Sequence, residues 1–98
     1  MARRRKPKVY DHNGVKVTYH SFTRWCERFP ERDLAEEYDR AVFRLTNAER
    51  KGVRARCSLD KNKEYCNRDN DQRFMRKTRD GIVFVVDRQD VVITVFQI

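Results

Sequence analysis

The sequence is poor in the residues and runs that define several classes of protein. Only three glycines occur among 98 residues, and no glycine-rich loop is present that would cradle a phosphate. No run of 18 apolar residues occurs, which excludes a membrane-spanning helix. The opening residues, MARRRKPKVY, lack the apolar stretch of a secretory signal. GxSxG and HExxH are both absent, so serine-hydrolase and zinc-protease chemistry have no support.

Cysteine is scarce as well. Cys26, Cys57 and Cys66 form no CxxC pair, and Cys57 and Cys66 have no histidine close by. An odd number of cysteines without a signal sequence is typical of reduced thiols in the cytoplasm. A structural zinc ion needs a fourth ligand that the sequence does not supply. We expect no metal, no cofactor and a cytoplasmic location, in a host cytoplasm if the chain is phage-encoded.

Basic residues dominate what is present. Lys and Arg number 23 against 15 Asp and Glu, which gives a net charge of +8 and predicts an acidic partner, for which nucleic acid is the usual candidate. The length predicts one domain, over residues 9–98. Residues 1–8 form a basic arm, which is either a solvated tail or a segment that follows phosphates. Its basic residues are Arg3, Arg4, Arg5, Lys6 and Lys8.

In the first half of the domain, the sequence predicts a β-ribbon followed by two helices. Residues 9–10 and 15–19 flank Asn13-Gly14, a pair that favours a tight hairpin turn. A helix capped by Ser21 follows, with an apolar stripe that ends before Pro30. The stripe is Phe22, Trp25, Cys26 and Phe29, and we expect Trp25 and Phe29 in the core. A second helix begins after Asp33 and extends to Arg50-Lys51, where Gly52 stops it.

The second half predicts strands. Alternating apolar and polar residues indicate a strand over 53–59, and a long polar loop follows over 60–71. Further strands are expected over 72–79, 82–86 and 91–96, joined by tight turns. The run at 82–86 is apolar throughout, as in a strand buried on both faces. The predicted fold is therefore α+β, with an N-terminal β-ribbon and two helices packed on one face of a four-stranded antiparallel meander.

Two groups of basic residues are candidates for contact with phosphate. His20, Arg24 and Arg28 recur every four residues, on the side of their helix away from the apolar stripe. Arginine holds phosphate oxygens through a planar fork, and histidine titrates near neutral pH. The alternative is a solvated basic side with a structural histidine.

The second group lies on the predicted sheet. Basic residues around exposed aromatics would contact phosphates while bases stack, unless that side of the sheet carries charge for solubility alone. The group is Arg54, Arg56, Arg73, Arg76, Lys77 and Arg79. Thr94 is the one polar side chain within VVITVF, and either fits its strand or places a hydroxyl near a phosphate.

The series His20-x3-Arg24-x3-Arg28, a second amphipathic helix, a basic strand and FVVDRQDVVITVF resembles the small ribonuclease toxins of the RelE and barnase–EndoU–colicin fold group. The resemblance covers about residues 19–98. It implies metal-independent cleavage of RNA by attack of a ribose 2′-hydroxyl on the adjacent phosphorus. His20 would carry a proton, Arg24 and Arg28 would bind phosphate, and Thr94 would orient it.

Candidates for the second proton carrier are Tyr19, Tyr65 and Lys77. Together with this resemblance, the sequence predicts a toxin-like endoribonuclease that binds RNA, with a cognate inhibitor or a host protein as a further partner and no membrane contact. The alternative is a non-catalytic regulator, phage-encoded for example, that binds nucleic acid or a host protein on the same fold. A third hypothesis is an inhibitor whose basic side docks on an acidic enzyme surface.

Overall fold

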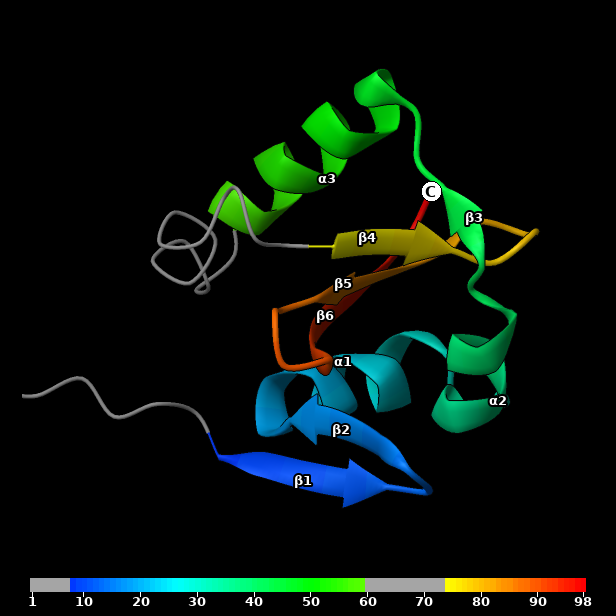
Figure 1. Cartoon of the computed structure of the whole chain (residues 1–98), viewed down its shortest axis with the longest axis vertical. Coiled ribbons are helices and arrows are strands. Elements are labelled where there is room, and N and C mark those ends of the chain that lie inside the picture. Colours follow the sequence, from blue (N-terminus) through cyan, green and yellow to red (C-terminus); the bar gives the residue numbers. More distant parts are fainter. Residues whose placement is uncertain (1–7, 60–73) are drawn as a thin grey trace, which may run out of the picture.

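The computed structural model describes residues 8–59 and 74–98, which form three helices and six strands (Figure 1). Expectations for Arg3, Arg4, Arg5, Lys6, Tyr65, Arg73 and the loop 60–71 lie outside these residues. The strands are β1 (Val9–His12), β2 (Val15–Thr18), β3 (Phe43–Arg44), β4 (Phe74–Lys77), β5 (Ile82–Val86) and β6 (Val91–Gln97). The helices are α1 (Tyr19–Arg28), α2 (Leu34–Arg40) and α3 (Asn47–Leu59).

The predicted N-terminal hairpin is confirmed. β1 pairs antiparallel with β2, and Asn13 and Gly14 both have positive φ, at 51° and 89°. Two positive φ angles are what a tight two-residue hairpin turn requires. The Asp11 carboxylate also accepts a 2.8 Å hydrogen bond from the Gly14 amide and so closes the turn.

The N-cap of helix α1 lies three residues earlier than the sequence predicts. Thr18 is its N-cap: the Thr18 hydroxyl accepts from the Ser21 amide, and the Ser21 hydroxyl accepts from the Thr18 amide. Ser21 is therefore the third helical residue of a reciprocal capping box and not the cap itself. Trp25 and Phe29 are buried as predicted, whereas Cys26 is exposed.

The predicted second helix is wrong beyond Arg40. Asp33 does cap α2, by accepting from the Glu36 amide, but the helix ends after seven residues. Ala41-Val42-Phe43 leads into the short strand β3, since a β-branched and an aromatic residue favour extended backbone. The helix that was predicted to end at Gly52 is in fact two helices with a strand between them.

The predicted strand over 53–59 is also wrong, because α3 runs through Gly52 to Leu59. A capping box starts this helix. The Thr46 hydroxyl accepts from the Glu49 amide, and the Glu49 carboxylate accepts from the Thr46 amide at 2.8 Å. Arginine and alanine in the following residues favour a helix, and only Val53 of the alternating apolar residues 53 and 55 is buried.

The sheet is larger than predicted and it is mixed. Its strand order is β1-β2-β6-β5-β4-β3, and β2 pairs parallel with β6. The antiparallel succession of β4, β5 and β6 is as expected, but the four-stranded antiparallel meander is wrong. The parallel pair arises because the hairpin adds to the sheet beside β6 instead of standing apart from it.

Helices cover both faces of the sheet, not one as predicted (Figure 1). The side chains of β5 alternate between two cores. Ile82, Phe84 and Val86 pack with Trp25 of α1, with the C-cap residue Phe29 and with Leu34 of α2. Val83 and Val85 pack on the other face with Val53 of α3. All five residues of β5 are buried, so the prediction of a strand buried on both faces is confirmed.

Candidate nucleic-acid interface

Two arginines from different helices meet at one edge of β6. β2 pairs with this strand only at Val91 and Val92. Further along the same strand, Arg28 of α1 donates to the Val95 carbonyl at 2.6 Å, and Arg56 of α3 donates to the Gln97 carbonyl at 2.8 Å. The two side chains thus satisfy carbonyl groups at a place where β2 does not extend the sheet.

The same two guanidinium groups lie against the ring of Phe96. Their central carbons are 5.3 Å (Arg28) and 4.7 Å (Arg56) from the centre of the ring, within the range of a cation–π contact. Phe96 itself is buried in the core beneath α3. The edge of β6 therefore fixes two positive charges close together at the surface of the molecule.

A shallow depression of about 550 Å³ opens beside these arginines. Arg28, Arg32 and Arg56 contribute to its lining, together with Gln97 and residues 29–31. A second depression, of about 460 Å³, includes Arg56, Lys77 and Arg79. Because Arg56 lines both, the two depressions meet at this side chain.

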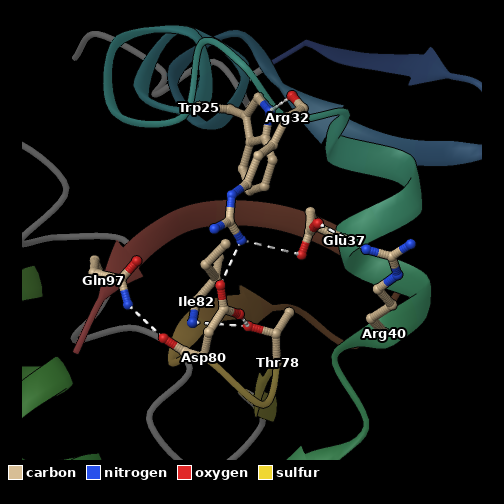
Figure 2. A network of polar contacts seen from close by, with 8 residues as sticks. All are labelled: Trp25, Arg32, Glu37, Arg40, Thr78, Asp80, Ile82 and Gln97. Atoms are coloured by element: carbon tan, nitrogen blue, oxygen red, sulfur yellow. Dashed lines mark hydrogen bonds and ion pairs between the residues drawn. The ribbon is translucent and has the colours of Figure 1, made fainter.

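Carboxylates neutralise some of the cations in these depressions. Arg32 lies 2.5 Å from Asp80 and 3.8 Å from the buried Glu37. Both contacts are drawn as dashed lines in Figure 2. A hydrogen bond from the Thr78 hydroxyl and the contact with Arg32 lower the pKa of Asp80 below its ordinary value of 3.8. The same Asp80 contact raises the pKa of Arg32. This network ties the α1–α2 connection to the turn after β4.

Lys77 is neutralised in a similar way. Its ammonium group lies 2.8 Å from the Glu49 carboxylate of α3, and that contact lowers the pKa of Glu49 below its ordinary value of 4.5. The ion pair joins the first turn of α3 to β4. Arg32 and Lys77 therefore hold the structure together at the rim of the depressions.

Charge is divided unevenly along the fold. Residues 43–56 and 74–79, here called the basic half, carry eight Lys or Arg and one Glu, a net charge of +7. They form β3, most of α3, β4 and the turn after it. Residues 27–42, here called the acidic half, carry six Asp or Glu and three Arg, a net charge of −3. They lie at the end of α1 and in α2.

The predicted catalytic residues lie on α1 and β6. His20 Nε2, Arg24 Nε and Thr94 Oγ1 are all fully buried. Thr94 pairs with Val85, which places its side chain on the face covered by α3. Arg28 reaches β6 within two residues of Thr94 and is not on the side of α1 away from the sheet. The structure thus brings Arg28 close to the segment of β6 that carries Thr94. The polar atoms His20 Nε2, Arg24 Nε and Thr94 Oγ1 are surrounded by protein.

The predicted sheet surface changes because Arg54 and Arg56 lie on a helix. Two residues apart on a helix, they point in different directions and not to one side as on a strand. Arg76 and Arg79 are exposed, whereas Met75 is buried and offers no surface for stacking. Tyr19 is 72% exposed. Lys8, next to β1, is exposed and is the one basic residue of the arm within the described part of the chain.

The sequence reasoning missed three basic residues of this region: Arg44, Arg50 and Lys51. The motif Thr46-x-x-Glu49 would have found two of them, because a capping box there predicts a basic helix over the residues that follow. Arg44 gives no such indication, since β3 has only two residues.

Comparison with known protein families, with curated proteins and with solved structures found no match to this chain. In the described part of the chain, no helix is both long and apolar enough to cross a bilayer. Nor do residues 8–59 and 74–98 bring three or more His, Cys, Asp or Glu together as metal ligands would lie. The arginines at the edge of β6 and the charge of the surrounding surface therefore carry the functional evidence.

Proposed function

We propose that this protein binds RNA through its basic half. The observation that carries the proposal is the uneven division of charge, +7 in the basic half against −3 in the acidic half. The basic half attracts a polyanion and the acidic half repels it. This difference in charge orients the polyanion on the surface of the protein. The resemblance to ribonuclease toxins favours RNA as the polyanion.

Cations without an acidic neighbour support the proposal further. Among the described residues, six side chains of the basic half form no ion pair: Arg44, Arg50, Lys51, Arg56, Arg76 and Arg79. In the acidic half, Arg32 and Arg40 both contact carboxylates. A cation that is not already paired gains most from a phosphate, and its binding releases a counterion from the nucleic acid.

The test compares two variants that lose the same charge. Arg50→Gln with Lys51→Gln removes two charges from α3, and Lys16→Gln with Arg88→Gln removes two from β2 and the β5–β6 turn. Binding of a fluorescent 20-nucleotide RNA is measured by anisotropy over a series of salt concentrations. We expect the α3 variant to bind about 10-fold more weakly and with a smaller salt slope, by roughly 0.7 for each lost phosphate contact. The control should change less than about 3-fold.

Equal weakening of the two variants, or no affinity for RNA at low salt, would contradict the proposal. A melting curve of each variant shows whether the protein remains folded, so a loss of affinity through unfolding is recognised.

Cleavage of the RNA stays a prediction. The buried positions of His20 Nε2 and Thr94 Oγ1 favour binding over cleavage as the function of this conformation. Incubation of the protein with the same RNA in excess chelator distinguishes the two. Shortened products indicate a metal-independent nuclease, and retention of intact RNA indicates a binding protein.

A further inference from the structure

Two arginines lie directly opposite each other on β3, which is the edge strand, and its neighbour β4. Arg44 of β3 pairs in register with Arg76 of β4, and both side chains are exposed. Directly opposite residues on one face of an antiparallel pair have Cβ atoms about 4.5–5.5 Å apart. Two like charges at that separation destabilise the strand pair.

No carboxylate offsets this repulsion by an ion pair within the described ranges, 8–59 and 74–98. The pair lies on the face that α2 covers, since Arg76 is also opposite Phe84 of the first core. An unfavourable arrangement of this kind becomes favourable when an anion binds between the two guanidinium groups.

The other face of the same edge also has features suited to nucleic acid. Phe43 is opposite Lys77, on the face that α3 covers, and 45% of its surface is exposed. A base stacks readily on an exposed aromatic ring. The two consecutive residues of β3 thus present a ring on one face of the sheet, and on the other face an arginine that is paired with Arg76 of β4.

We infer that a single strand of RNA crosses the edge of the sheet at β3, with a phosphate held between Arg44 and Arg76. The inference rests on the proposed function and extends it to a path and a substrate class. A polymer that contacts α3 and also this arginine pair must turn around a strand of two residues. A single strand bends in this way, whereas a duplex is stiff over such lengths.

The experiment measures binding and stability on the same variants. Arg44→Gln and Arg76→Gln are compared with Lys16→Gln, a control that lies beyond β6 in the strand order. The probes are a fluorescent 12-nucleotide oligouridine and a 12-base-pair RNA duplex. We expect Arg44→Gln and Arg76→Gln to bind the oligouridine about 5- to 10-fold more weakly, and Lys16→Gln to stay within about 2-fold. The duplex should bind more weakly than the oligouridine and should be insensitive to both arginine variants.

Stability should change in the opposite direction. Removal of one of two facing like charges should raise the melting temperature of the unbound protein by about 1–4 °C. An arginine with only a structural role would lower the melting temperature. Arginine variants with lower melting temperatures and unchanged oligouridine affinity would overturn the inference, as would equal losses for duplex and oligouridine.

A second measurement separates this inference from the proposed function. If the wild-type protein binds no RNA, the proposed function fails and the crossing strand fails with it. The anion site is then tested with inorganic phosphate at constant ionic strength. Phosphate should raise the melting temperature of the wild type more than that of Arg44→Gln, and equal increases would exclude the site.

Discussion

The guanidinium group of Arg56 lies over the ring of Phe96, with its central carbon 4.7 Å from the ring centre. Arg56 also donates to the Gln97 carbonyl, so it both covers the ring and fixes the end of β6 to α3. Arg28 of α1 also makes a cation–π contact with the Phe96 ring. One aromatic side chain thus joins helices that lie on opposite faces of the sheet.

Replacement of Arg56 by Ala should lower the free energy of unfolding by about 1–2 kcal/mol, through loss of the cation–π contact and the hydrogen bond. Arg56→Lys should recover only part of this, because an ammonium group lacks the planar fork. Lys51→Ala, an exposed change on the same helix, is the control. Denaturant titration measures all three, and equal stability of Arg56→Ala and the control would show that the contact contributes little.

Gly52→Ala should stabilise the protein by about 0.5–1 kcal/mol. Gly52 lies inside α3, and a Cβ there would meet no atom within 4 Å. Alanine favours a helix interior more than glycine does. If Gly52 instead ended a helix in the left-handed region, the same change would destabilise the protein. The sign of the change in melting temperature therefore tests whether 47–59 is one helix.

Acid should destabilise the protein in part through Asp80. A carboxylate whose pKa is lowered by folding contributes stability above its unfolded pKa, and that contribution disappears as the pH falls through the folded pKa. The pKa of Asp80 is lowered, first by Thr78 and then by Arg32, so its contribution should be complete at pH 7 and should decline as the pH falls below about 4.

Asp80→Asn should therefore melt at a lower temperature than the wild type at pH 7, with a difference that narrows toward pH 2–3. Asp39→Asn, which removes an exposed carboxylate of α2, is the control. Thermal melts at pH 7, 5, 4, 3 and 2 measure the difference. A gap of constant size over that range would contradict the assignment.

Thr94→Val should preserve or raise stability, by up to about 1 kcal/mol. The Thr94 hydroxyl is buried and has no hydrogen-bond partner among the described residues, and valine has nearly the same shape without the hydroxyl. Loss of an unsatisfied polar group from a core is favourable. The melting temperature checks this, and a fall of several degrees would indicate that the hydroxyl has a partner.

His20→Ala should lower the melting temperature while the folded variant keeps wild-type affinity for RNA. Its Nε2 atom is buried, so a structural role explains its position. The catalytic hypothesis predicts a different result, a loss of roughly 10²- to 10⁴-fold in cleavage rate with stability preserved. Single-turnover cleavage in chelator, RNA affinity and melting temperature together distinguish the two.

The parts of the fold that could be predicted from the sequence are those fixed by neighbouring residues. Asn13-Gly14 determines its hairpin, and the apolar run 82–86 identifies its buried strand, because each depends on local geometry or on burial alone. The strand prediction for residues 53–59 is wrong because the alternating pattern is short, and residues four apart in such a pattern also lie on one side of a helix. The capping box at Thr46 and Glu49 resolves that ambiguity.

The interface was less predictable than the fold. The arginine positions on α3 follow from the sequence once the helix is known, but the meeting of Arg28 and Arg56 at Phe96 depends on how two helices pack on opposite faces. The register of Arg44 with Arg76 likewise depends on a strand of two residues, which is too short for a periodic pattern. Long-range packing of this kind leaves no local trace in the sequence.

The parallel pairing of β2 with β6 joins Lys16 and Val17 to Val91 and Val92. During synthesis, β2 has no parallel strand to pair with until β6 has left the ribosome. The hairpin can form early from local contacts, but its addition to the sheet must wait for the last strand. Until then both outer carbonyl-bearing edges of the hairpin are open to other chains. The completion of this fold therefore requires closure of the long loop between β2 and β6, which costs conformational entropy that local hairpin formation does not.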